Sequence, residues 1–554
     1  MTDNANLYAH FQQHFPADLD TPLLFSKEMF PEKVVTKEGS PNEVLADGGR
    51  TAGRRCVTYA EADTASARIA NSLLKLGAIA GDRITVQVEK SVENLFLYLA
   101  CLRAGLVYHP LNTAYTASEL SYFLGNAEPT IVICGSDALA TIKSVLPARG
   151  EKEMGVKAVL TLDADGSGNL MQGAAQASAK ADIAHREGTD MAALLYSSGT
   201  TGRPKGIMLS HDNLRKNAET LVEIWGFSAS DRLLHMLPIY HVHGLFVGVS
   251  CVLMSGASME WHPGFNDKAA IAALPDCTVM MGVPTFYTRL LSNPDFGQEC
   301  CSNVRLFISG SAPLLTETFV EFQERTKHTI LERYGMTETG MNTSNPLRGE
   351  RRAGTVGPPL PGVTARVVGE AGEPIATGET GNLQVRGPNV FPGYWRMPEK
   401  TAEDFTADGF FNTGDKAIID ADGYVSIVGR AKDMVITGGL NVYPKEIELV
   451  IDDMAGVKES AVIGVPHADF GEAVLAVIVA DGLVADGLVA DSPVVDGTSV
   501  TSGVPTAAEV IAHCKTQLAN FKVPKRVEII DSLPRNAMGK VQKNLLRERF
   551  AGNG

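Results

Sequence analysis

The sequence has few of the features that mark secreted, membrane-spanning or zinc-binding proteins. Its 554 residues include only eight cysteines, which are scattered and never in a C-x-x-C spacing, so neither a zinc site nor a redox pair is expected. The first six residues, MTDNAN, show no basic and apolar leader. The longest apolar stretch, residues 245–257, is too short to span a bilayer. We therefore expect a cytoplasmic protein with reduced thiols.

Positive charge is also scarce. Lys and Arg total 49 against 64 Asp and Glu, which gives a net charge of −15. A general nucleic-acid binder needs a broad basic face, and attachment to anionic lipid needs basic clusters, so we expect neither nucleic acid nor membrane as a partner. The 44% hydrophobic content is typical of a soluble globular protein. The length predicts two or more domains.

Alternating strand and helix patterns predict an α/β fold. Thr58 and Glu61 have the spacing of a capping box and open a helix to about residue 76, and residues 83–88 alternate as a strand. A helix over 91–104 and a buried strand over 130–134 continue the alternation, which predicts layered, largely parallel sheets. Residues 355–428 predict a β-rich subdomain. Beyond residue 429, helices near 447–450 and 509–518 and strands near 459–463 and 527–530 predict a compact α+β unit.

Two segments stand apart from this pattern. Residues 31–55 have little periodicity and are expected to form a loop. Residues 479–505 begin with a five-residue repeat, VADGL, VADGL, VADS, and continue into a stretch rich in Pro, Gly, Ser and Thr. The repeat is too short and irregular for a solenoid, so we expect a surface loop insertion without a function of its own.

A glycine-rich loop is the most informative stretch of the chain. Residues 196–206 read YSSGTTGRPKG and follow a short apolar strand. Small hydroxylated residues and glycines let backbone N–H groups and hydroxyls converge on an anion, and Lys205 adds positive charge. The spacing differs from G-x-x-x-x-G-K-[ST], so this would be a phosphate loop of another type. Without other signals, a flexible Ser/Gly turn would be the simpler interpretation.

The loop resembles the phosphate-binding signature of the adenylate-forming superfamily, which includes acyl-CoA synthetases, peptide-synthetase adenylation domains and luciferases. Four further stretches resemble its motifs, in its order: 334–339 (YGMTET), 412–415 (NTGD), 429–433 (GRAKD) and 534–540 (PRNAMGK). The resemblance implies an AMP-binding domain over 1–430, a hinge over 431–433 and a small mobile domain over 434–554. It also implies ATP, Mg²⁺ and CoA as the cofactor and co-substrates of an AMP-forming ligase.

The resemblance also implies roles for single residues. Lys540 would be the catalytic lysine that contacts the carboxylate and the α-phosphate. Glu338, with Thr200, would hold Mg²⁺ and act in catalysis, and Asp415, joined by Arg430, would bind the ribose. Taken alone, each has an ordinary structural explanation, such as a solvated surface lysine for Lys540, a helix-start carboxylate for Glu338 and a structural turn for Asp415.

The remaining nucleotide and CoA contacts are also expected from the resemblance. Tyr334 would stack on adenine, Lys432 would be the pivot of the hinge, and Gly438 and Gly439 would line a tunnel for pantetheine. The other expected binding residues are Ser197, Ser198, Gly199, Thr201, Gly202, Lys205, Ser309, Gly310, Ser311, Arg333, Gly335, Met336 and Thr337.

Three stretches bear on the acid that is used. In the superfamily, the residue at the position of His241 lies beside the acyl carboxylate, so His241 is expected to act in catalysis and to contact the acid. No further ligands accompany the His-x-His pair, so it does not predict zinc. Arg289 falls one helical turn after Thr285 and would offer a fork of donors to a second carboxylate. By itself it would more often be a surface residue. Met341 and Ser309 are expected to lie beside the bound acid.

These stretches resemble malonyl-CoA synthetases, so malonate is the expected substrate. Because a buried charge without a partner is costly, Arg289 would favour a dicarboxylate over a monocarboxylate. Three alternatives stay open: a ligase for methylmalonate or a short- or medium-chain monocarboxylate, a carrier-protein-loading adenylation enzyme, and a non-catalytic scaffold. The sequence also leaves open a monomer or a homodimer, and regulation through a lysine acetyltransferase and deacetylase acting on Lys540.

Overall fold

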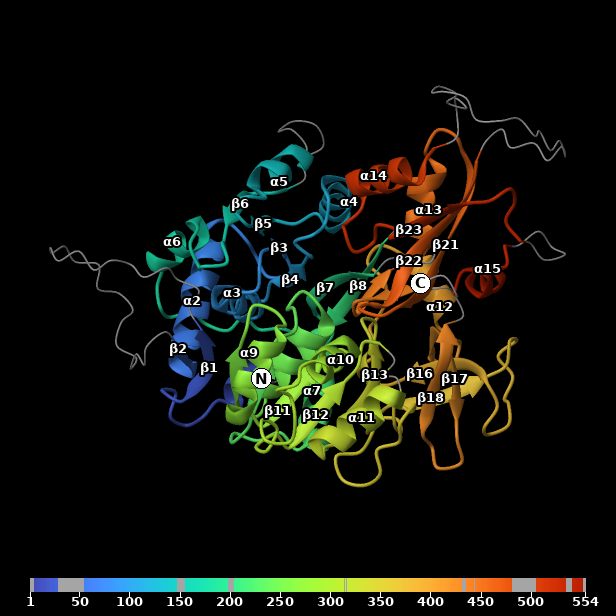
Figure 1. Cartoon of the computed structure of the whole chain (residues 1–554). Helices are drawn as coiled ribbons and strands as arrows, with labels where there is room; N and C mark the ends of the chain where they lie inside the picture. Colours follow the sequence, from blue (N-terminus) through green and yellow to red (C-terminus); the bar gives the residue numbers. More distant parts are fainter. Residues whose placement is uncertain are drawn as a thin grey trace. The chain divides into compact units, whose positions relative to one another are not determined.

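The computed structural model describes residues 4–27, 54–146, 155–197, 204–312, 314, 316–430, 435–442, 444–480, 505–534 and 541–551. The chain divides into two compact units (Figure 1). The first comprises Met1–Thr113, Phe123–Leu195 and Gly206–Gly429, and the second comprises Ala114–Tyr122, Tyr196–Lys205 and Arg430–Gly554. The expected hinge over 431–433 lies outside the described residues, so the domain boundaries stay a prediction.

An eight-stranded sheet forms the centre of the first unit. Its strands lie in the order β14-β13-β12-β11-β9-β10-β1-β2. The pairs from β13 to β1 are parallel, and an antiparallel strand closes each edge. The bounds are β1 Pro22–Lys27, β2 Arg54–Thr58, β9 Arg232–His235, β10 Ser258–Trp261, β11 Val279–Gly282, β12 Leu306–Ser309, β13 Leu331–Met336 and β14 Gly340–Ser344. Only the last two residues of the expected 31–55 loop are described, and they belong to β2.

Both faces of this sheet are covered, because alternate side chains of a strand point to opposite faces. Leu234, Met280 and Phe307 face a core with α9 (Asp267–Ala273), α10 (Pro284–Ser292) and α11 (Thr316–Thr326), which Figure 1 shows beside β11 and β12. Leu233 and Ile308 face a second core, which includes residues of α1 (Leu7–Gln13), α7 (His211–Trp225), η1 (His243–Val249) and α8 (Ser250–Leu253). The loops at the carboxyl ends of the strands are thereby held by packed elements.

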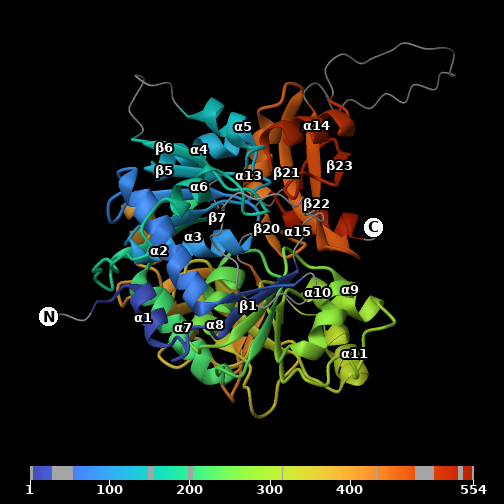
Figure 2. The same ribbon diagram turned by 90° about the vertical axis from the view of Figure 1, so that its left-hand side faces the viewer.

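A six-stranded sheet in the order β6-β5-β3-β4-β7-β8 completes the α/β part. Its strands are β3 Arg83–Gln87, β4 Val107–Pro110, β5 Ile131–Cys134, β6 Ala158–Thr161, β7 Met191–Ser197 and β8 Lys205–Ser210, and its helices are α2 Tyr59–Lys75, α3 Val92–Arg103, α4 Ala117–Ala127, α5 Leu139–Val145 and α6 Asn169–Ala175. The capping box that opens α2 is confirmed, with the Glu61 N–H donating to Thr58 Oγ1 at 3.1 Å. The expected parallel pairing is confirmed as well. Figure 2 shows α2 beside α3, whose twelve residues are all buried.

The expected β-rich subdomain is confirmed by a third sheet, in the order β15-β16-β17-β18. Its strands are β15 Thr364–Val368, β16 Gly381–Arg386, β17 Phe411–Ile419 and β18 Val425–Arg430, with α12 (Pro398–Asp404) beside them in the chain. The Thr413-Gly414-Asp415 stretch lies inside β17, so the ordinary interpretation of it as a turn is wrong. Gly414 keeps a φ of +75° there, a value that favours glycine.

The second unit contains a five-stranded sheet in which β20-β19-β22-β21 follow one another and β23 pairs with β22. The elements are β19 Val435–Thr437, β20 Leu440–Val442, α13 Pro444–Asp452, β21 Val457–His467, β22 Gly471–Ala480, α14 Ala507–Gln517, β23 Arg526–Ile529 and α15 Lys543–Phe550. This confirms the expected α+β pattern. Val479 and Ala480 of the repeat end β22, and residues 481–504 lie outside the described residues.

The cysteines and the apolar stretches also bear on the sequence expectations. None of the eight cysteines forms a disulfide, and six of them are buried. Burial raises the pKa of the Cys134 and Cys514 thiols to about 11. Across the described ranges, no helix is long and apolar enough to cross a membrane. Residues 245–257 contribute instead to the buried η1 and α8.

Candidate active site

Several predicted nucleotide-binding residues fall outside the described part of the chain. They are Ser198, Gly199, Thr200, Thr201, Gly202, Lys432 and Lys540. At the flanks of the glycine-rich loop, Ser197 ends β7 and is half-buried, while Lys205 begins β8 and is buried. Arg430 is the last residue of β18. The roles of all these residues stay predictions.

The carboxyl ends of β11, β12 and β13 bring two of the predicted motifs together. These strands run parallel, so the 309–311 turn after β12 lies against β13. A Cβ on Gly310 would lie 2.5 Å from the Arg333 guanidinium, so only glycine lets the two approach. Ser311, held at a φ of +72°, places Oγ 3.2 Å from Nδ1 of His243. Four residues from three sequence regions thus surround one strand end.

Arg333 is the most unusual charge in this group. Its side chain is 3% exposed, and its Nε and Nη2 atoms have no hydrogen-bond partner among the described residues. Burial lowers the pKa of Arg333 to about 10. A buried cation without a partner costs several kcal/mol, so this arrangement favours an incoming anion.

The neighbouring acid does not neutralise Arg333. Successive strand residues point to opposite faces, and the carboxylate of Glu332 accepts the Leu314 N–H at 3.2 Å. Burial raises the pKa of Glu332 to about 7. The cation at this strand end therefore remains available to a bound anion.

Tyr334 and Asp415 connect two sheets inside the first unit. The Tyr334 hydroxyl donates to Oδ2 of Asp415 at 2.5 Å, and both side chains are buried. Thr337 and Glu338 lie in the turn between β13 and β14, and Glu338 is buried. The alternative in which Glu338 starts a helix is therefore wrong. Met341, on β14, is 2% exposed.

The residues predicted to border the acid lie on separate segments of the first unit. His241 lies in the exposed part of the loop after β9, with its ring 4.7 Å from that of Tyr240. Arg289 is on α10 and is exposed, so its pairing with a carboxylate stays a prediction. His243 is buried at the start of η1, and its Nε2 has no partner within the described ranges. The sequence did not predict a role for His243, although the His-x-His spacing could have indicated one.

A buried chain of hydrogen bonds supports the segment 241–244 after β9, which we call the histidine loop. Lys90 Nζ lies 2.8 Å from His235 Nδ1 and 4.3 Å from the centre of the Trp261 ring. Nε2 of His235 lies 2.9 Å from the carbonyl oxygen of Gly244, next to His243. Because an amine donates to Nδ1, His235 carries its proton on Nε2 and donates it to Gly244. No local sequence pattern predicts these hydrogen bonds.

Gly438 and Gly439 form the two-residue turn between β19 and β20. Their φ angles are +57° and +78°, a combination that favours glycine in a tight hairpin. The turn explains both glycines without a ligand. Their expected place along a pantetheine tunnel stays a prediction.

The described residues contain no group of three or more His, Cys, Asp and Glu side chains that could hold a metal ion. Mg²⁺ does not require such a group, because one or two carboxylates together with substrate phosphates and water suffice for it. The buried Glu338 carboxylate fits this coordination.

Comparison with known proteins identifies the class. The AMP-binding enzyme family matches residues 32–395, and the AMP-binding enzyme C-terminal domain matches residues 446–540. The chain belongs to this family of adenylate-forming enzymes. Its similarity to named CoA ligases over most of its length makes it an AMP-forming acid–CoA ligase, with ATP and CoA as substrates.

Three comparisons illustrate the range of relatives. The crystal structure of ATP-bound MatB from Rhodopseudomonas palustris is 48% identical, has a TM-score of 0.72, and the match covers 99% of each chain. Malonate–CoA ligase of Arabidopsis thaliana is 34% identical over 85% of this chain and 78% of its own length. Feruloyl-CoA synthase of Amycolatopsis is 33% identical over 92% of this chain and 96% of its own.

Proposed function

We propose that this enzyme ligates malonate to CoA through malonyl-AMP. The single observation that carries the proposal is the buried Arg333, whose Nε and Nη2 donors have no partner among the described residues, at a strand end shared with Ser309 and His243. Such a site is suited to an acid with more than one anionic group. The similarity to a malonate–CoA ligase over 85% of the chain supports this choice of acid.

In the first step, one carboxylate oxygen of malonate attacks the α-phosphorus of ATP. A P–O bond to malonate forms, the bond to the β-phosphate oxygen breaks, and pyrophosphate leaves. Charge builds on the phosphoryl oxygens during this displacement, so fixed cations and hydrogen-bond donors lower the barrier. Lys540 and Lys205 would supply these cations, and Asp415 and Tyr334 would hold the nucleoside. Mg²⁺ would neutralise phosphate charge, with Glu338 as its carboxylate ligand.

In the second step, the sulfur of CoA attacks the acyl carbonyl of malonyl-AMP. A C–S bond forms, the C–O bond to AMP breaks, and the thiol proton passes to solvent or a base. Arg289 would hold the second carboxylate throughout, because a dicarboxylate offers one group for reaction and one for pairing. A monocarboxylate would leave a guanidinium without a partner.

A panel of acids with ATP, Mg²⁺ and CoA tests the proposal. Malonate should give the largest kcat/KM for thioester formation, and malonate should also drive exchange of pyrophosphate into ATP. Arg289→Leu should abolish malonate turnover and leave ATP binding intact, while Arg348→Leu, at an exposed arginine after β14, should have no effect. If Arg289→Leu still turned over malonate, Arg289 would not belong to the acid pocket. If the wild-type enzyme preferred another acid, malonate would not be its substrate.

A further inference from the structure

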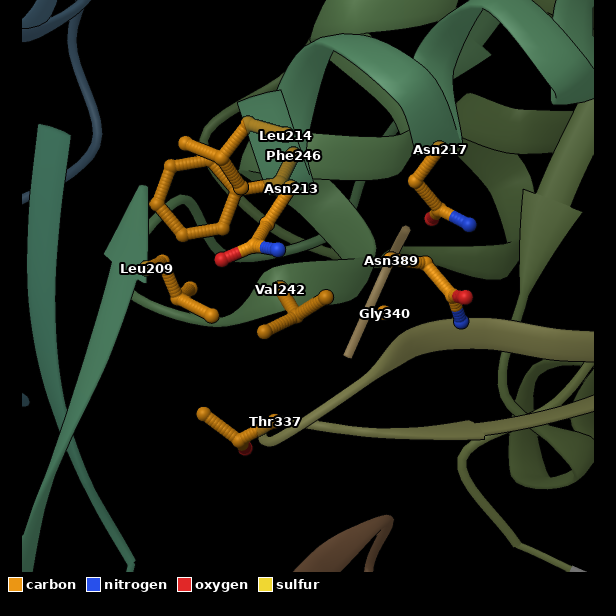
Figure 3. Close-up of a pocket in the computed structure, with 9 residues that line it drawn as sticks. All are labelled: Leu209, Asn213, Leu214, Asn217, Val242, Phe246, Thr337, Gly340 and Asn389. Carbon is orange, nitrogen blue, oxygen red and sulfur yellow. The ribbon is translucent and has the colours of Figure 1, made fainter. Parts of the chain in front are cut away.

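Two buried asparagines hold the strand that carries Met341. Asn217 lies on α7 and Asn389 lies in the loop after β16, and they are 6% and 3% exposed. Figure 3 shows both side chains beside Gly340, in a pocket that Val242 and Thr337 also line. The same pocket therefore touches the histidine loop and the turn that carries Glu338.

Asn217 satisfies both backbone polar groups of Met341. Its Oδ1 accepts the Met341 N–H at 3.0 Å, and its Nδ2 donates to the Met341 carbonyl oxygen at 3.0 Å. β14 is an edge strand of the eight-stranded sheet, and its register with β13 shifts between Tyr334 and Gly335. One asparagine thus makes the pair of hydrogen bonds that a neighbouring strand would otherwise provide.

Asn389 ties the same segment to the turn that carries Glu338. Its Nδ2 lies within hydrogen-bond distance of the carbonyl oxygens of Met341, at 3.0 Å, and Thr339, at 2.8 Å. The Phe391 N–H, two residues further on, donates to the carbonyl oxygen of Glu338 at 2.8 Å. The loop after β16 therefore fixes the backbone on the Glu338 side, whereas Asn217 fixes only Met341.

Two glycines make this arrangement possible. Gly340 has a φ of +58°, and a Cβ there would lie 2.6 Å from Oδ1 of Asn217. A Cβ on Gly335 would lie 2.6 Å from Cε of Met341, so the methionine methyl group rests on the bare backbone of β13. The backbone of Met341 is thus fixed by Asn217, and the end of its side chain by Gly335.

We propose that Asn217 is a specificity-determining positioning residue that acts through Met341. By holding the backbone of Met341, it sets where the methionine side chain lies beside the bound acid, and so it favours a small acid over one with a bulkier substituent. Asn389 holds the same peptide but also the neighbouring turn, so it affects both acid choice and nucleotide use. This inference rests on the proposed function in one respect, namely that Met341 borders the bound acid.

The test is the ratio of kcat/KM for malonate to that for ethylmalonate. Asn217→Ala should lower this ratio by roughly tenfold and leave KM for ATP unchanged. Asn389→Ala should lower the ratio and raise KM for ATP. Asn71→Ala is the control, because Asn71 on α2 also donates to two carbonyl oxygens, those of Ser178 and Lys180 at 2.9 Å, but at the protein surface. It should leave both quantities unchanged.

A cycle with Met341→Ala decides the question even if Asn217→Ala does not fold. Asn217→Asp keeps an acceptor for the Met341 N–H and loses the donor, so it should lower the ratio by a smaller factor. That effect should disappear in the Met341→Ala background if Asn217 acts through Met341. An equal loss of turnover for both acids, or an effect that persists in that background, would overturn the proposal. A wild-type enzyme that ignores malonate would overturn the proposed function instead, and the same cycle would then use its preferred acid and the next larger homologue.

Discussion

The hydroxyl of Tyr334 and the carboxylate of Asp415 form a 2.5 Å hydrogen bond between β13 and β17. Eighty-one positions separate them in the chain, so the contact fixes two of the predicted nucleoside-binding side chains to each other before any ligand arrives. Preorganisation of this kind lowers the entropic cost of binding.

Removing this hydroxyl should weaken nucleotide binding and spare the acid site. In Tyr334→Phe the ring that would stack on adenine remains, but Asp415 loses a donor. We expect KM for ATP to rise about threefold to tenfold, with KM for malonate unchanged. Steady-state kinetics with each substrate varied in turn measures both values. A change confined to KM for malonate would contradict the assignment of this pair.

Replacing Arg333 should maintain or raise the stability of the unliganded protein but lower its activity. Because Nε and Nη2 of its buried guanidinium lack a partner among the described residues, Arg333→Met removes a charge that is costly without ligand. We expect the thermal unfolding temperature of the unliganded protein to hold or rise by a few degrees, and pyrophosphate exchange to fall by at least about a hundredfold.

A paired arginine supplies the matched comparison for Arg333. Arg305 forms an ion pair with the buried Asp231 at 2.7 Å. Arg305→Met should therefore lower the unfolding temperature and leave kcat unchanged, since a buried carboxylate loses its partner. If both variants lose stability to the same extent, the anion-binding interpretation of Arg333 fails.

The hydrogen bonds that link Lys90, His235 and Gly244 should affect kcat. Lys90→Met removes the donor to His235 Nδ1 and with it the constraint on the His235 proton. We expect kcat for adenylation to fall about tenfold, with KM for ATP unchanged, because the histidine loop loses its anchor. Lys216→Met, at a lysine paired with Glu219 on α7, is the control. An unchanged kcat in Lys90→Met would show that these hydrogen bonds serve only folding.

Stability should fall in mild acid, in part through His211. This buried ring accepts the Leu7 N–H at Nδ1 at 3.0 Å, and burial lowers its pKa to about 4. A folded-state pKa below the unfolded value of about 6.5 means that the stability is fully present above pH 6.5 and is lost as the pH falls towards 4.

Denaturant unfolding at several pH values checks this expectation. His211→Gln should flatten the profile between pH 6.5 and 4, by at most about 3 kcal/mol at the lower end. His185→Gln, at an exposed histidine, should keep the wild-type slope. An identical slope in all three proteins would assign the acid sensitivity to other groups.

The repeat insertion should be dispensable. β22 ends at Ala480 and α14 begins at Ala507, and residues 481–504 carry most of the repeat. Replacing 482–503 by a short Gly/Ser linker should leave kcat and KM within about twofold, because loop length has a small effect on closure entropy. A loss of activity with retained folding would assign the insertion a function.

Local signals in the sequence were sufficient for many elements but not for the centre of the site. The capping box of α2 needs only residues three apart, so Thr58 and Glu61 predicted it correctly. The contact between Asn217 and Met341 joins positions 124 apart, and the environment of Arg333 depends on the order of parallel strands. No periodicity encodes either one.

The motif resemblance predicted some of the site residues that local patterns could not. It selected Tyr334, Asp415 and Arg333 without showing that the first two form a hydrogen bond with each other. Nor did it show that Nε and Nη2 of Arg333 lack a partner among the described residues. Gly438 and Gly439 illustrate the reverse case. A ligand was expected to explain them, whereas the φ angles of a two-residue hairpin are sufficient.

The buried cysteines have a consequence for an enzyme that makes an activated acyl group. A mixed anhydride reacts readily with thiolates, and the intended nucleophile is the thiol of CoA. Burial raises the pKa values of Cys101, Cys134, Cys251, Cys301 and Cys514. At neutral pH these side chains remain protonated and shielded. A buried, protonated thiol is a poor nucleophile, so these cysteines compete little with CoA for the acyl group.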